Sequence, residues 1–379
     1  MAGARIEPVT TDRHRFLTRG HIVSLLNSSR PDATTAAAGA LPPLPPSNSA
    51  ERHELLDHPA MMIATRGCVF VKEVGRSLGF PARTICTAQL LIHRTYIARS
   101  APSISSSDLA TACLFVAAKM EETVKRLKDI MAHSYLNSLP KTPSSAATRP
   151  DPQTVSTAIT DKMRPSVLAG EQFVMDAIGF DFRTTHAHLS YIKLARLAGL
   201  PKAGIAADGW TILSDAYFTT LPVQYPSVVL AMGALCLAWN LGCETAQSFS
   251  SSILQSFGAK PPPSRSRDTT NGAREPTRSG TERSVADKTS ATADALSSRR
   301  PLSLDLTAEW WLNFGVTTED IQGFVRQIAD FYLMFFNSTA ASAEYIERHK
   351  AGLPSREMSQ KIGQWRIKLS SASITPVTP

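Results

Sequence analysis

The chain of 379 residues carries a net charge of +8, and 43% of its residues are hydrophobic. This apolar content suffices for two or three packed domains, whereas 25 prolines and several Ser/Thr/Ala tracts indicate that part of the chain does not fold. The five cysteines show no CxxC spacing, the longest apolar run (Val228 to Leu241) is too short to cross a bilayer, and the first 20 residues lack the apolar core of a signal peptide. We therefore expect an intracellular protein with reduced cysteines and no metal site.

The first half of the chain shows helical periodicity. Residues 1–50 are expected to be largely disordered, with one short helix candidate at Ile22 to Leu26. Apolar residues then recur at spacings of three and four, and strand-type alternation is absent. Helices are predicted over Met62–Leu78, Thr84–Arg99, Leu109–Ala118 with Asp108 as its cap, Val124–Leu139, Ser166–Ile178 after Pro165, and His186–Leu197, with a polar loop over Lys141–Thr160.

The segment from Thr111 to Asp129 ends an apolar, small-residue helix abruptly in charge. Small residues allow neighbouring helices to approach closely, so this helix is expected at the centre of a domain. Lys119 then lies where the helix emerges, closely followed by Glu121 and Glu122. Two interpretations remain open: a binding site presented by a rigid element, or a solvated last turn that the helix dipole favours.

A weak internal repeat predicts a second helical unit. The helix predicted over Gly209–Thr219 and the apolar helix Ser227–Leu241 echo Thr84–Tyr96 and Leu109–Ala118. The pattern resumes at Leu306 and continues in a helix over Thr318–Phe336. The sequence therefore predicts an all-α protein with two tandem helical units.

Much of the positive charge lies in an insert within the second unit. Between Ser256 and Arg300 there are nine basic and five acidic residues, a surplus of four, which is half of the net charge. The insert is rich in Pro, Ser, Thr and Gly and has almost no large apolar residues, which is typical of a disordered segment. It offers no aromatic stacking platform, so direct nucleic-acid binding is expected to be weak at most.

Four segments together resemble the cyclins, most closely the transcription-type cyclins: cyclin K, cyclin T and the fungal beta subunits of kinases that act on the RNA polymerase II C-terminal domain. They are Arg66–Tyr96, ACLFVAAKMEET at Ala112–Thr123, GEQFVMDAIGFDF at Gly170–Phe182, and Trp210–Trp239, joined later by an EWW string at Glu309–Trp311. The resemblance implies two tandem cyclin boxes of five helices. The expected boundaries are a first box at 51–183, a second box at 184–256 and 301–340, a disordered basic insert at 257–300, and a C-terminal tail at 341–379.

The resemblance implies a regulatory subunit that binds and activates a cyclin-dependent kinase in the nucleus. The kinase expected from the resemblance phosphorylates the RNA polymerase II C-terminal domain during transcription. In the family, a lysine that ends the central helix of the first box and a glutamate of a later helix reach the regulatory helix of the kinase. The matching positions here are Lys119 and Glu171, with Met120, Glu121 and Glu122 beside them. The subunit itself contributes no chemistry and needs no cofactor.

Two features depart from this pattern or compete with it. The arginine that opens the first box in many cyclins would fall near Ala64, with Arg66 two positions along, so its ion pair is expected to be shifted or missing. His186 and His188 form an HxH that lacks further metal ligands, and we expect a structural role for both.

The sequence also leaves alternative functions to weigh. It has no phosphate-binding loop, HRD or DFG pair, or HExxH, so an enzyme is not expected. The alternative function is a general transcription factor of the TFIIB type, which has cyclin-like folds and acts without a kinase. Such a factor would need a zinc ribbon before the first box, and no cysteine precedes Cys68.

Overall fold

A computed structural model describes residues 16–28, 58–99, 104–139, 151–198, 200, 204–242, 310–339 and 352–372. Every regular element among these residues is helical, so the predicted all-α class is confirmed. The insert predicted at 257–300 and Cys243 lie outside the described residues. No helix in the described ranges is long and apolar enough to cross a membrane.

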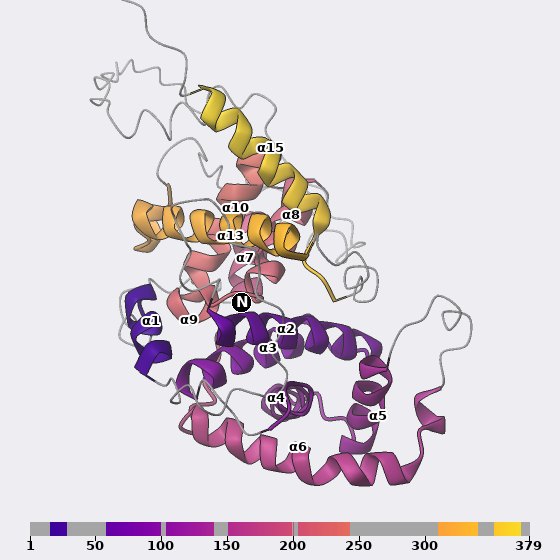
Figure 1. The fold of residues 1–379 in the computed structure, drawn as a ribbon. Coiled ribbons are helices and arrows are strands. Elements are labelled where there is room, and N and C mark those ends of the chain that lie inside the picture. The colour runs from indigo at the N-terminus through magenta and orange to yellow at the C-terminus, as the bar shows by residue number, and fades with distance from the viewer. Residues whose placement is uncertain are drawn as a thin grey trace, which may run out of the picture.

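The first helical unit consists of five helices, with α4 at its centre (Figure 1). Helix α4 is covered by the other four, and its apolar residues from Leu109 to Ala118 are almost all buried. Small residues make this packing close: a methyl group on Gly170 would lie 2.9 Å from the Cβ of Ala112, so α6 can lie directly against α4. The helices of this unit are α2 (Pro59–Ser77), α3 (Ala82–Ala98), α4 (Ser106–Met120), α5 (Leu127–Ser138) and α6 (Thr157–Ala177), with a short 3-10 helix η4 (Pro152–Thr154) before α6.

The second helical unit repeats the plan around α10. This helix is buried from Val228 to Ala238 and packs against α7, α8 and α13, as the internal repeat predicted. Gly233 allows α13 to approach α10 closely, because a Cβ there would collide with the ring of Phe324. The elements are α7 (Ala187–Leu197), α8 (Ile205–Ala216), α9 (Leu221–Gln224), α10 (Ser227–Gly242), the 3-10 helix η5 (Trp310–Phe314) and α13 (Thr318–Thr339).

Two terminal helices are more extensive than the sequence patterns suggested. Helix α1 (Arg19–Ser28) extends the short candidate in both directions, and its Ile22 and Leu26 are buried. Helix α15 (Arg356–Ala372) falls in the segment expected to be a C-terminal tail, and it packs against α13. Isolated helices of such length are marginal in water, so both elements depend on the surfaces against which they pack.

Two local predictions in the first unit were wrong. Helix α6 begins at Thr157 and not at Ser166, so Pro165 lies inside the helix. The true cap is Ser156, whose hydroxyl accepts a hydrogen bond from the Ala158 amide, and the proline removes only one internal hydrogen bond. The cap of α4 is Ser105 and not Asp108. Asp108 instead accepts a hydrogen bond from the Ser166 hydroxyl at 2.7 Å and so joins α4 to α6.

Candidate protein-binding site

The last turn of α4 presents Lys119 beside Glu171 of α6. The Lys119 ammonium lies 2.5 Å from a carboxylate oxygen of Glu171 and 4.1 Å from the ring centroid of Phe115. The lysine side chain is 49% exposed, whereas that of Glu171 is 13% exposed. The close packing of α4 on α6 therefore joins two residues that are 52 positions apart in the chain into one surface pair.

Glu122 occupies the turn that ends α4. Its φ angle of 55° lies in the left-handed region, where glycine or asparagine is usual after a helix. Three backbone hydrogen bonds hold the turn: the Glu121 amide donates to Ala117 and the Thr123 amide to Ala118, each at 2.9 Å, and the Glu122 amide donates to Lys119 at 3.3 Å. The Glu122 side chain is exposed as a result. Met120 is half-buried and packs against the core.

The Glu121 carboxylate is directed into the molecule. It accepts a hydrogen bond from the Thr87 hydroxyl of α3 at 2.7 Å and lies 3.0 Å from Nε2 of His186, and the side chain is 8% exposed. The backbone carbonyl of Glu121 also accepts a hydrogen bond from Arg83. Glu121 thus ties the end of α4 to α3 and to the segment that leads into α7. The prediction that it binds a partner remains untested.

The histidine pair has a structural environment. His186 contacts Glu121, whereas Nε2 of His188 lies 3.0 Å from the Ser214 hydroxyl, and burial lowers the pKa of His188 to about 4. Among the residues that the structure describes, no group of three His, Cys, Asp or Glu side chains is placed to hold a metal ion.

Two phenylalanines after α6 were not singled out by the sequence patterns. Phe180 is 60% exposed and Phe182 is 44% exposed, and their rings meet edge to face with centroids 6.2 Å apart. Phe180 has a φ angle of 56°, which is unusual for a large residue. The available sequence signal was the string GFDF, in which two aromatic residues alternate with polar ones just after a helix-ending glycine.

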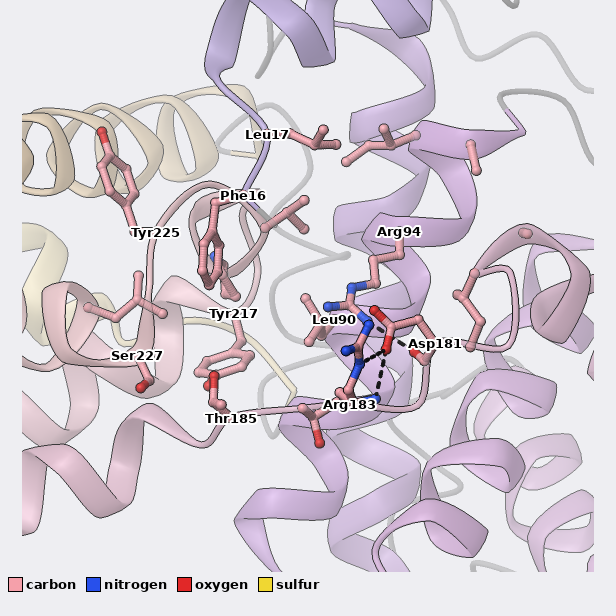
Figure 2. A pocket seen from close by; sticks show the side chains of 18 of the residues that line it. Phe16, Leu17, Leu90, Arg94, Asp181, Arg183, Thr185, Tyr217, Tyr225 and Ser227 are labelled. Atoms are coloured by element: carbon pink, nitrogen blue, oxygen red, sulfur yellow. Dashed lines mark hydrogen bonds and ion pairs between the residues drawn. The ribbon is translucent and has the colours of Figure 1, made fainter. Parts of the chain in front are cut away.

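Asp181, which lies between the two phenylalanines, and Arg183, which follows them, line a cavity. Asp181 accepts a hydrogen bond from Arg183 at 2.8 Å, and its backbone carbonyl accepts one from Arg94 of α3. Figure 2 shows these side chains together in a cavity of about 310 Å³, which residues of α1, the first unit and the second unit all line. The contacts of Asp181 hold the segment that carries both phenylalanines.

We call seven residues of α4, of α6 and of the turns that follow them the α4–α6 surface: Phe115, Lys119, Met120, Glu122, Glu171, Phe180 and Phe182. Exposed aromatic rings and a partly exposed ion pair are typical of a protein interface, where aromatic anchors and desolvated charges provide most of the binding energy. The seven residues of the α4–α6 surface include no nucleophile paired with a general base. The arrangement can therefore hold another protein segment.

Comparisons with known proteins show which proteins this chain is similar to in sequence and in fold. Residues 48–183 match the family model described as cyclin, N-terminal domain. Cyclin-T1-4 of Arabidopsis thaliana is 29% identical over 171 residues, which cover 45% of this chain and 31% of that protein. The CTD kinase subunit beta of Schizosaccharomyces pombe is 29% identical over 192 residues, covering 51% and 54%. Human cyclin-K is 28% identical over 180 residues, covering 46% and 28%.

The likeness to these relatives is partial in length, since the matches span between about a quarter and a half of each relative. A solved structure, the yeast RNA Pol II CTD kinase CTDK-1 complex, shares the fold with a TM-score of 0.55 at 15% identity, covering 96% of this chain and 86% of that one. Residues 48–183 therefore match a cyclin N-terminal domain, and the chain is similar in sequence to cyclins T and K and to the fungal CTD kinase beta subunit.

Proposed function

We propose that this protein is a regulatory subunit that binds and activates a cyclin-dependent protein kinase through the α4–α6 surface. The observation that carries the proposal is the Lys119–Glu171 pair, which lies at the two positions that the resemblance to cyclins assigned to kinase binding. The pair lies within a chain segment that matches the cyclin N-terminal domain, and the same segment carries two exposed phenylalanines, Phe180 and Phe182.

The mechanism is positional. An active protein kinase needs the glutamate of its regulatory helix paired with the lysine that holds the ATP phosphates. A rigid external surface can hold that helix inward. Lys119 and Glu171 offer a donor and an acceptor to the helix or its neighbouring loop. Phe180 and Phe182 lose water-exposed apolar area on contact, and because each ring is already about half-buried, each contributes roughly half of the about 1.5–3 kcal/mol that burial of a fully exposed ring provides. The regulatory subunit then supplies no reacting group.

The finer proposal is that the kinase acts on the RNA polymerase II C-terminal domain, in the nucleus. Support comes from a relative named CTD kinase subunit beta and from cyclins T and K among the matched proteins. The polymerase tail would then be the substrate of the complex and not of this chain.

Affinity purification of the tagged full chain tests both levels. We expect a protein kinase to co-purify and to phosphorylate a polymerase heptad-repeat peptide. A Lys119→Ala variant should lose the kinase, whereas Lys193→Ala, which removes an exposed lysine on α7, should retain it. Recovery of polymerase and promoter factors without any kinase would instead favour a factor of the TFIIB type.

A further inference from the structure

The segment from Gly352 to Ile362 lies against both helical units. Its Leu353, Met358 and Ile362 are 9%, 2% and 0% exposed, so the segment is part of the core. The contact with the first unit is very close, because a methyl group on Gly352 would lie 2.5 Å from the backbone carbonyl oxygen of Val69 in α2. Only a residue without a side chain fits there while the segment stays in place.

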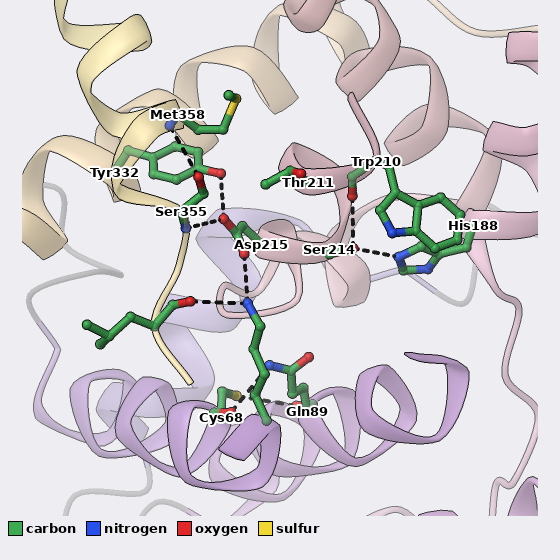
Figure 3. A network of polar contacts seen from close by, with 12 residues as sticks. Cys68, Gln89, His188, Trp210, Thr211, Ser214, Asp215, Tyr332, Ser355 and Met358 are labelled. Carbon is green, nitrogen blue, oxygen red and sulfur yellow. Dashed lines mark hydrogen bonds and ion pairs between the residues drawn. The ribbon is translucent and has the colours of Figure 1, made fainter. Parts of the chain in front are cut away.

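Asp215 of α8 joins the segment to both units. Its carboxylate lies 3.1 Å from the Lys72 ammonium of α2, and it accepts hydrogen bonds from the Tyr332 hydroxyl of α13 at 2.8 Å and from the Ser355 amide at 2.6 Å (Figure 3). Lys72 also donates to the backbone carbonyl of Leu353 at 3.2 Å. One carboxylate therefore takes donors from the first unit, the second unit and the C-terminal segment.

The charged side chains that join the two units and the C-terminal segment are almost completely buried. The side chain of Asp215 is 2% exposed and that of Lys72 is 12% exposed, and the ammonium lies 4.6 Å from the ring centroid of Phe218. Buried charges are tolerated when they are paired and their remaining hydrogen-bonding capacity is used. The Leu353 carbonyl and the Ser355 amide supply part of that capacity, so the charge pair depends on the segment.

Helix α15 continues the attachment to the second unit. Lys361 lies 2.9 Å from the Asp208 carboxylate of α8, and the Ser359 hydroxyl donates to the backbone carbonyl of Tyr332. None of these residues belongs to the α4–α6 surface.

We propose that residues 352–362 form a clasp that fixes the orientation of the second helical unit relative to the first, with Lys72, Asp215 and Ser355 as positioning residues. A partner that touches both units then meets a preorganised surface and loses less freedom on binding. The consequence for kinase activation rests on the proposed function, whereas the consequence for the orientation of the two units does not.

A pair of glycine substitutions tests the clasp. Gly352→Ala forces the segment away from α2, whereas the control Gly363→Ala, in the helix α15 that follows, meets only a methyl of Leu333 at 3.9 Å. In the full chain, Gly352→Ala should speed amide hydrogen exchange at Ser355 and along α15 by about tenfold or more, as expected when a locally closed element opens more often. Gly363→Ala should leave these rates unchanged or slower, because alanine favours a helix.

The orientation is measured by the distance between spin labels at Lys128→Cys on α5 and Arg196→Cys on α7. Both positions are exposed, four native cysteines are buried, and Cys243 is replaced by serine. A broader distance distribution in Gly352→Ala than in Gly363→Ala supports the clasp. Identical narrow distributions, or unchanged exchange rates, overturn it.

A charge cycle tests the role of Asp215. Asp215→Asn leaves the Lys72 ammonium without its buried counter-charge, so it should broaden the distance distribution and speed exchange at Ser355. Adding Lys72→Met removes that unpaired charge and should restore much of the narrow distribution. A distance distribution as broad in the double variant as in Asp215→Asn alone would show that the unpaired Lys72 charge does not cause the broadening.

Kinase activation by the same variants separates the two proposals. If the kinase found by affinity purification is activated less by Gly352→Ala than by Gly363→Ala, the clasp acts as a positioning device. Equal activation despite an opened clasp would overturn that role. A wild-type chain that activates no kinase would contradict the proposed function, while the exchange and distance measurements on the isolated chain would still decide the clasp.

Discussion

Lys119 and Glu171 are each other's partners in the unbound protein, with the ammonium 2.5 Å from the carboxylate. A kinase must therefore compete with, or bind alongside, an existing ion pair. Since the pair is partly exposed, it contributes only about 0.2–1 kcal/mol to folding, and its loss should hardly change the melting temperature. The pair is available for recognition at little cost to stability.

Reversing this pair separates recognition from folding. Lys119→Ala and Glu171→Ala should each weaken kinase binding by about thirtyfold, equivalent to about 2 kcal/mol, because a desolvated partner charge on the kinase is left unpaired. The double reversal Lys119→Glu/Glu171→Lys can rebuild the internal ion pair, yet it places each charge opposite the wrong group of the kinase. We expect the double variant to have the melting temperature of the wild type and to bind the kinase no more tightly than the alanine variants do. Scanning calorimetry of the variant measures the melting temperature, and titration calorimetry with the purified kinase measures the affinity. Normal binding by the alanine variants would show that these positions do not contact the kinase.

The exposed phenylalanines should be required for binding and dispensable for folding. Asparagine tolerates the positive φ angle of 56° better than phenylalanine does, so the Phe180→Asn variant should be at least as stable as the wild type. It should also lose about tenfold or more in kinase affinity, because aromatic anchors dominate interface energies. Leu189→Asn is the matched control, since Leu189 is a 62% exposed apolar residue on α7. Similar affinity losses in both variants would point to a general effect of surface polarity.

Glu121 should behave as a structural residue. Glu121→Ala removes the acceptor of the Thr87 hydroxyl and the contact with His186, and should lower the free energy of unfolding by about 1–3 kcal/mol. Urea unfolding followed by circular dichroism measures this loss. Glu122→Ala, one residue along and exposed, is the control and should change stability much less. A fully stable Glu121→Ala protein that fails to bind the kinase would instead support direct contact.

Stability should fall in mild acid. Burial lowers the pKa of both His93 and His188 to about 4, below the value of about 6.5 in an unfolded chain. Above pH 7 both histidines are neutral in either state and contribute no pH dependence. As the pH falls from about 6.5 towards about 4, the unfolded chain binds protons that the folded chain refuses, which costs about 2 kcal/mol per histidine at pH 5. Urea unfolding midpoints measured at pH 7 and pH 5 give the loss of stability between the two pH values. A His93→Gln/His188→Gln variant should lose less stability over the same range.

The helical class and the two central helices could be predicted from the amino-acid sequence alone. Runs of small and apolar residues such as Leu109–Ala118 and Val228–Leu241 can form helices and must be covered on all sides, which requires no knowledge of the neighbours. The resemblance of the strings around Lys119 and Glu171 also indicated the two residues that the structure places in contact. Both inferences depend on short stretches of sequence.

Which charged and aromatic side chains face outward depends on long-range packing and could not be predicted from the sequence. Glu121 and Glu122 are adjacent and chemically identical, yet one carboxylate is held by Thr87 and His186 while the other is exposed, because the turn after α4 places them on opposite sides of the backbone. The docking of α15 through Ser355 and Asp215 also could not be predicted from local patterns. Periodicity shows that a residue lies on one side of a helix, but the free energy of burying it depends on the partner that long-range packing brings to that side.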